Sequence, residues 1–133
     1  MYLLDTNICI YLMKNTYPKM ADKLFSYQPE LFAISSVTVY ELAYGAAKSN
    51  WGERSKNNMA MFLAPFTIIP FSSEDGMTAG YIRSYLEKEG KLIGPYDLQI
   101  AAQALTRNMI LITHNTKEFI RVPGLKIEDW TES

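Results

Sequence analysis

The chain has 133 residues, of which 48% are hydrophobic and 20% are charged, and its formal net charge is −1. The length and composition fit one globular domain, and the net charge predicts no overall attraction to nucleic acid. The sequence contains no apolar run near the ~20 residues that a membrane span needs. The single cysteine excludes an internal disulfide and a cysteine-built zinc site, and the N-terminus lacks the pattern of a secretion signal, so we expect a cytoplasmic protein.

Short apolar runs alternate with segments of helical periodicity along the chain. In chain order we predict a strand at 1–4, helices at 5–14 and 19–27, a strand at 31–35, a helix that begins between Ser36 and Thr38 and ends at Lys48, a helix at 52–64, a strand at 66–71, helices at 72–90 and 95–108, a strand at 109–113, a helix at 115–122 and a strand at 125–130. Strands that alternate with helices and are apolar throughout indicate an α/β fold. We expect a mainly parallel sheet of four or five short strands with helices on both faces.

Four oxygen-bearing side chains are predicted at one edge of this sheet. Asp5 follows the first strand, Glu41 lies near the start of the helix after the second strand, and Asn115 follows the strand at 109–113. Asp97 lies in the first turn of the helix that leads into that strand. Parallel sheets bind ligands at the carboxyl ends of their strands, so we expect these side chains to meet there. Oxygen ligands suit Mg²⁺ or Mn²⁺, and a cation would relieve the repulsion between the carboxylates.

Each of these residues also has a purely structural explanation. Asp5 can cap the helix that it precedes, and Asp97, in the first turn after Pro95, suits the helix dipole. Two pairs match the capping-box pattern, Thr38-x-x-Glu41 and Asn115-x-x-Glu118. The metal-site interpretation gains weight because a charge at the end of a buried strand is costly and all four residues fall on one edge.

Four segments occur in the order "YLLDTNICIYLMK", "SSVTVYELAYGA", "IGPYDLQIAAQAL" and "LITHNTKEF". In this order and spacing they resemble the PIN-domain ribonucleases, and among them the VapC-type toxins of bacterial toxin–antitoxin pairs. The resemblance extends from Asp5 to the terminal "IEDW". It implies a three-layer PIN-like fold, with residues 1–133 forming a single PIN domain.

The resemblance also implies an acidic site that holds Mg²⁺, for which Mn²⁺ can substitute. Asp5, Glu41 and Asp97 match its first three positions, with Asp5 and Asp97 as direct metal ligands. The fourth position is often aspartate in PIN domains and is Asn115 here. This departure should weaken a second metal site, and it leaves Glu118 as the alternative fourth member.

Two threonines match polar positions that flank the site in the family. These are Thr6 and Thr113, for which we predict a substrate-positioning role.

The activity implied by the resemblance is endoribonuclease cleavage of single-stranded or loop RNA by an activated water. Toxins of this type from enteric bacteria cut the anticodon loop of initiator tRNA, and "GPYD" and "IEDW" point to the same target. The implied partners are a cognate VapB-type antitoxin and a second copy of the chain, in a homodimer that assembles into a larger toxin–antitoxin complex. No membrane association is expected.

Three other functions share features with this sequence. The departure at Asn115 leaves open a catalytically silent PIN-like module that binds RNA or protein. A haloacid dehalogenase-type phosphatase needs a second aspartate where "LLDTN" has Asn7. A structure-specific DNA nuclease shares the fold, but this short chain lacks room for the insertions that such enzymes use.

The remaining candidates favour structural explanations. His114 is the only histidine and is interpreted as structural or solvated, while Cys9 is assigned to the core. Most aromatic residues are also assigned to the core, with base stacking by Tyr96 or Trp51 as the alternative. Two basic groups can form either a solvated surface or a phosphate-binding rim: Lys48, Arg54 and Lys56, and Arg83, Lys88 and Lys91.

Overall fold

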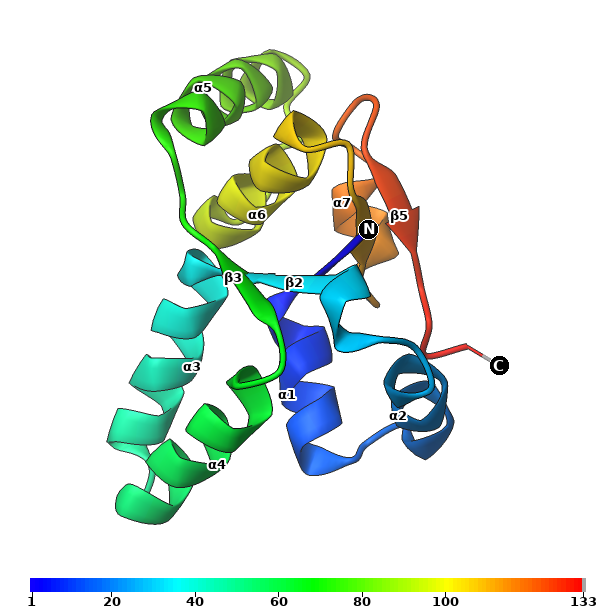
Figure 1. The fold of residues 1–133 in the computed structure, drawn as a ribbon. Coiled ribbons are helices and arrows are strands. Elements are labelled where there is room, and N and C mark those ends of the chain that lie inside the picture. The colour runs from blue at the N-terminus through cyan, green and yellow to red at the C-terminus, as the bar shows by residue number, and fades with distance from the viewer. Residues whose placement is uncertain (133) are drawn as a thin grey trace.

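The computed structural model describes residues 1–132, which form a five-stranded parallel sheet in the order β3-β2-β1-β4-β5 (Figure 1). The strands are β1 (Tyr2–Leu4), β2 (Phe32–Ser35), β3 (Thr67–Ile69), β4 (Ile110–Ile112) and β5 (Lys126–Glu128). The helices are α1 (Thr6–Lys14), α2 (Pro18–Phe25), the short 3₁₀ helix η1 (Pro29–Leu31), α3 (Ser36–Lys48), α4 (Glu53–Leu63), α5 (Ser73–Lys88), α6 (Pro95–Thr106) and α7 (Thr116–Phe119). The predicted α/β class, the parallel sheet and the order of elements are confirmed.

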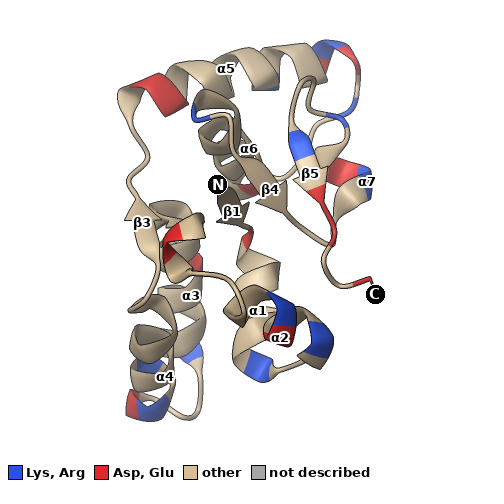
Figure 2. Cartoon of the chain, turned by 45° about the vertical axis from the view of Figure 1, so that its right-hand side comes forward, with Lys and Arg blue, Asp and Glu red and all other residues tan. Residues whose placement is uncertain are grey.

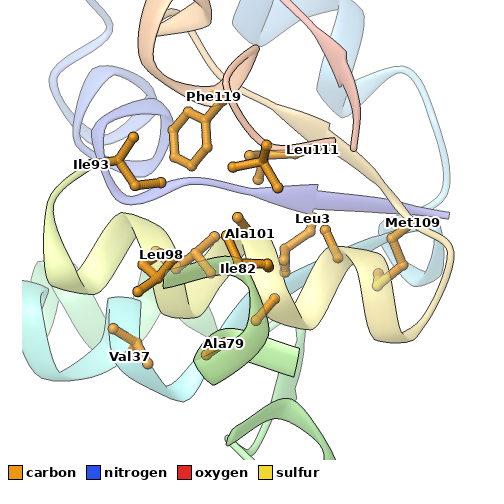
Figure 3. Packing of buried hydrophobic residues seen from close by; sticks show 14 of the residues in the cluster. Leu3, Val37, Ala79, Ile82, Ile93, Leu98, Ala101, Met109, Leu111 and Phe119 are labelled. Carbon is orange, nitrogen blue, oxygen red and sulfur yellow. The ribbon is translucent and has the colours of Figure 1, made fainter. Parts of the chain in front are cut away.

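The sheet separates two apolar cores, which explains why its strands carry apolar residues on both faces. Leu3 of β1 and Leu111 of β4 belong to the first core, together with α5, α6 and α7. Figure 3 shows this cluster, in which the sheet residues meet Ala101 of α6 and Phe119 of α7. Leu4 begins the second core, which includes residues of α1, α2 and α3 and packs against α4. The buried Cys9 lies in this second core, as predicted.

The termini of α5 show how local sequence sets the boundaries of a helix. Ser72 is the N-cap, and its side chain forms a capping box with Asp75. Gly90, just beyond the helix, has φ of +66°, a left-handed conformation that glycine adopts without strain. Asp75 is fully buried and accepts two hydrogen bonds from Arg107, at 2.6 and 3.1 Å, which fastens α5 to the end of α6.

Within residues 1–132, none of the helices has the length and apolar character required to cross a membrane. The β1 strand is central, with β2 on one side and β4 on the other. Because the three strands are parallel, the carboxyl ends of β1, β2 and β4 lie at the same edge of the sheet. Ligands bind at this edge in folds of this kind.

Candidate active site

Asp5 leaves β1 at this edge and is 3% exposed. It is the N-cap of α1, because its Oδ1 accepts a hydrogen bond of 2.8 Å from the backbone N–H of Ile8. Its Oδ2 accepts a hydrogen bond of 2.5 Å from the hydroxyl of Thr113, which follows β4. The structural and functional interpretations of Asp5 are thus compatible, since capping fixes one carboxylate oxygen and the neighbouring strand fixes the other.

Glu41 is placed by a chain of hydroxyl groups rather than by a capping box. The N-cap of α3 is Ser35, whose side chain accepts from the N–H of Val37, so the predicted Thr38–Glu41 capping box is wrong. The hydroxyl of Thr6 donates to Glu41 Oε1 at 2.7 Å and lies 2.9 Å from the hydroxyl of Thr38. Because the hydroxyl of Thr6 donates its only proton to Glu41, the hydroxyl of Thr38 must donate to that of Thr6.

Asp97 lies in the first turn of α6, with its carboxylate directed to the same edge. Gly94 caps this helix, and a Cβ at Gly94 would lie 3.7 Å from Asp97 Oδ2 and 3.9 Å from Glu118 Oε1. The missing side chain therefore keeps the space between these two carboxylates open. Within the part of the chain that the structure describes, Asp97 makes no hydrogen bond that offsets the cost of its partial burial.

Asn115 does not cap α7 with its side chain, although it occupies the N-cap position. Its Nδ2 donates instead to Glu118 Oε2 at 2.6 Å, while Glu118 Oε1 accepts from the N–H of Gly94 at 2.8 Å. The backbone N–H of Asn115 donates to the hydroxyl of Thr113, which continues the link to Asp5. Asn115 thus contacts the site through Glu118, the residue that the sequence offered as the alternative fourth member.

The carboxylates repel one another across this edge. Burial, followed in size by the charges of Glu118, Asp5 and Glu41, raises the pKa of Asp97 to about 6. Burial also raises the pKa of Asp5 to about 6, although hydrogen bonds from Thr113 and Ile8 act in the opposite direction. Two carboxyl groups with raised pKa values, each increased by the other acids, form a site whose charge a cation would neutralise.

The donor set fits a hard divalent cation held in part by water. Within residues 1–132, no three His, Cys, Asp or Glu side chains are grouped closely enough to hold a metal ion by themselves. Asp5 and Asp97 supply carboxylate oxygens, and the open position at Gly94 leaves space beside Asp97. Magnesium commonly binds through one or two carboxylates and retains several waters, so an incomplete protein ligand set suits it.

Aromatic and imidazole groups surround the acidic edge without entering it. The hydroxyl of Tyr96 donates to that of Tyr40 at 3.2 Å, and this bond is the main reason that the pKa of Tyr96 is raised. His114 Nδ1 lies 2.9 Å from Asp129 Oδ2 and from the hydroxyl of Thr131. Since Thr131 donates to Asp129, His114 must carry its proton on Nδ1, and the residue has a structural partner as predicted.

The two basic groups do not form one phosphate-binding rim around the acidic edge, which was one of the two interpretations of these residues. Figure 2 shows basic segments spread over α2, α4, α7 and the turn after α5. The group on α5 and the group at the end of α3 and in α4 lie at opposite ends of the molecule (Figure 1). Within each group some charges are paired, as in Arg83–Glu87 and Lys56–Glu53.

A groove of about 780 Å³ lies between α1, α3 and α4, and Glu41 is one of the residues that line it. Most of its lining is apolar: Ile10, Met13, Leu42, Met59, Met61 and Phe62.

The sequence model of the PIN domain family matches residues 2–125. Among curated proteins, the tRNA(fMet)-specific endonuclease VapC of Shigella flexneri is 39% identical over 130 residues, which cover 98% of each chain. Ribonuclease VapC2 of Haemophilus influenzae is 40% identical over 129 residues, or 97% of each chain.

Solved structures agree with this relationship. The toxin chain of DNA-bound VapBC from Salmonella typhimurium superposes with a TM-score of 0.92 at 37% identity, covering 97% of both chains. VapBC2 from Rickettsia felis, bound to a DNA fragment from its promoter, gives a TM-score of 0.90 at 37% identity and covers 97% of this chain and 98% of that one.

Proposed function

The chain belongs to the PIN domain family, as a VapC-type ribonuclease, and from this premise we propose that it is a toxin that cuts the anticodon loop of initiator tRNA in the cytoplasm. The observation that supports this most directly is the pair of carboxyl groups, Asp5 and Asp97, both with a pKa of about 6 at the carboxyl edge of the sheet. The relatives are named as nucleases, which argues against the catalytically silent module.

We assign Mg²⁺, or Mn²⁺ in its place, to Asp5 and Asp97. When bound, such an ion supplies a water of lowered pKa and neutralises charge on the phosphate. Asp5 is held by Ile8 and Thr113 and therefore presents a fixed carboxylate with little freedom to reorient. Rigid placement of this kind reduces the reorganisation that catalysis otherwise requires.

Glu41 would orient the attacking water, and Glu118 would add negative charge to the site, as its effect on the pKa of Asp97 indicates. Thr6 fixes one oxygen of Glu41, and the other oxygen can accept a proton from the water. Glu118 is fixed by Gly94 and Asn115, so it contributes negative charge at a constant position. Water attack on phosphorus would break the bond to the 3′-oxygen, which takes up a proton from solvent, and would leave a 5′-phosphate and a 3′-hydroxyl.

In this mechanism Thr6 and Thr113 position carboxylates, a different role from the substrate positioning that the resemblance implied. Both hydroxyls donate to an acidic side chain, and both are at least nine-tenths buried.

The apolar groove that Glu41 helps to line is the proposed binding site of the antitoxin. A segment with apolar side chains would cover Met59 and Phe62, and a basic or aromatic residue at its end would reach the acidic edge. A homodimer through the region of α2 and α4 remains our prediction. Phe25 is 57% exposed there, and light scattering at micromolar protein concentration will measure the mass.

Cleavage mapping tests the proposed target. The protein is incubated with total cellular RNA and Mg²⁺, and new 5′-phosphate ends are sequenced. We expect one dominant cut in the anticodon loop of initiator tRNA, absent with the Asp5→Ala protein. Cuts distributed over messenger RNA, or cuts that persist in the Asp5→Ala protein, would contradict the proposal.

A further inference from the structure

The outer face of α3 carries exposed aromatic side chains, although the sequence predicted most aromatic residues to lie in the core. Tyr40 and Tyr44 are 54% and 60% exposed. They are four residues apart and therefore lie on the same face of the helix, with Lys48 one turn further along. The buried residues of α3 occupy other positions: Val37, Thr38, Leu42 and Ala46.

The row formed by Tyr40, Tyr44 and Lys48 begins beside the carboxylates of the proposed active site. Tyr40 directly precedes Glu41, and Tyr96 of α6 directly precedes Asp97. The two tyrosine rings make an edge contact with centroids 5.4 Å apart, and their hydroxyls are hydrogen-bonded. Tyr96 is itself 39% exposed, so an aromatic surface extends from the acidic edge onto α3.

A cation lies at the far end of the row. Lys48 Nζ is 4.9 Å from the centroid of the Tyr44 ring, within the range of a cation–π interaction. At a rise of about 1.5 Å per residue, Lys48 is roughly 12 Å along the helix from Tyr40. The row therefore runs from a negatively charged end, suited to a metal-bound phosphate, to a positively charged end that can bind another.

The charge of the protein makes such a row useful to a ribonuclease. The formal net charge is −1, and the acidic edge repels the phosphates of RNA. Stacking of bases on aromatic rings supplies affinity that does not depend on net charge, and it tolerates different sequences because every base has a π face.

We propose that Tyr96, Tyr40 and Tyr44 form a stacking track for unpaired nucleotides that flank the cleaved bond of single-stranded RNA, and that Lys48 binds a phosphate at its end. This rests on the proposed function, because it assigns the track to the substrate of that same site. The track binds and positions RNA, and the chemistry stays with the carboxylates.

Binding is measured by fluorescence anisotropy with a short fluorescein-labelled oligoadenylate, without divalent metal so that the RNA stays intact. Tyr44→Ala should weaken binding roughly 5- to 100-fold, whereas Tyr44→Phe, which keeps the ring, should bind within about twofold of the wild type. Tyr81→Ala is the matched control, because Tyr81 is 74% exposed on α5 at the other end of the molecule, and it should bind like the wild type. Lys48→Gln should reduce the salt dependence of binding by about one phosphate contact.

An oligonucleotide with abasic positions separates stacking from a general loss of structure. The wild-type protein should lose affinity for the abasic RNA, and Tyr44→Ala should lose much less, because its stacking partner is already gone. Equal losses in both proteins would overturn the track.

The remaining outcomes are equally decisive. If Tyr44→Ala binds like the wild type while the wild type cleaves RNA, the track is wrong and the proposed function stands. If the wild type neither binds nor cleaves RNA, both fall. If Tyr44→Ala turns a dimer into a monomer in light scattering and loses RNA affinity only for that reason, the face is an interface between two copies, which also overturns the track.

Discussion

The buried carboxyl group of Asp5 should destabilise the metal-free protein at neutral pH. Burial raises its pKa from 3.8 to about 6. The folded protein therefore holds this proton more tightly than the unfolded chain does, and the free energy of unfolding falls as the pH rises from about 4 to about 6 and stays low above that. This increase in the pKa of Asp5 corresponds to a loss of roughly 3 kcal/mol in the free energy of unfolding at neutral pH.

Asp5→Asn removes this charge while keeping the size of the side chain. The amide oxygen can still accept the hydrogen bond from Ile8 that caps α1, but one hydrogen bond with Thr113 is lost or rearranged, at a cost of about 1 kcal/mol. The net expectation at pH 7.5 is a gain of about 2 kcal/mol, or a Tm higher by roughly 6–10 °C. Near pH 4, where Asp5 of the folded wild type is protonated, the gain should turn into a loss of about 1 kcal/mol, because only the cost of the hydrogen bond with Thr113 remains.

Thermal unfolding followed by circular dichroism from pH 4 to pH 8 in metal-free buffer checks this. Asp22→Asn is the matched control, because Asp22 is exposed on α2 and its replacement should change the free energy by less than about 0.5 kcal/mol. Added Mg²⁺ should raise the Tm of the wild type more than that of Asp5→Asn. If Asp5→Asn is less stable than the wild type by the same amount at pH 4 and pH 7.5, Asp5 is only a helix cap and the reasoning fails.

Three further predictions address other parts of the molecule. Asn115→Asp should break the hydrogen bond to the neighbouring carboxylate, lower the Tm of the metal-free protein, and bind Mn²⁺ about five- to tenfold more tightly in titration calorimetry; unchanged Mn²⁺ affinity would count against a metal role for this position. Arg107→Met leaves the buried carboxylate of Asp75 without its cationic partner and should lower the free energy of unfolding by about 3–5 kcal/mol in denaturant at pH 7. Despite desolvation, hydrogen bonds with Arg107 and Ser72 hold the pKa of Asp75 below its usual value, so the loss should shrink in acid, and a pH-independent loss would refute this. Gly45→Phe should fill the groove, because no atom lies within 4 Å of a Cβ built at Gly45, and co-expressed antitoxin should then fail to suppress RNA cleavage. Gly80→Phe on α5 is the control, whose cleavage the antitoxin should still suppress, and suppression of both variants would place the antitoxin elsewhere.

The sequence predicted the fold well because the relevant signals are local. Short apolar runs bounded by helix signals identify buried parallel strands, and the carboxyl ends of such strands share one edge. These signals predict Asp5 and Asp97 at the same edge of the sheet, and the charge of Asp5 does contribute to the raised pKa of Asp97.

The hydrogen-bond partners could not be predicted, because they depend on contacts distant in sequence. Glu118 accepts from Gly94, 24 residues earlier, and Thr6 reaches Glu41 across 35 residues. Each hydroxyl or carboxyl group had several plausible local partners. The capping box at Thr38 was wrong because α3 begins at Ser36, one turn too early for Glu41 to occupy the third helical position.

The exposure of the tyrosines was also missed. Helical spacing shows that Tyr40 and Tyr44 share a face but does not show which face meets the core. In α3 the buried face is formed by Val37, Leu42 and other small or aliphatic residues, which leaves the larger rings outside.

The central claim is that Asp97 belongs to a metal-dependent RNA-cleaving site, and cleavage by Asp97→Asn tests it most directly. Within the described residues this side chain makes no hydrogen bond that the fold depends on, and losing its charge relieves repulsion, so the variant should fold with a Tm no lower than that of the wild type. With initiator tRNA as substrate and saturating Mg²⁺, we expect the wild type to release one pair of fragments and Asp97→Asn to release none above background. Normal cleavage by folded Asp97→Asn, or cleavage by the wild type that persists in EDTA, would contradict the account.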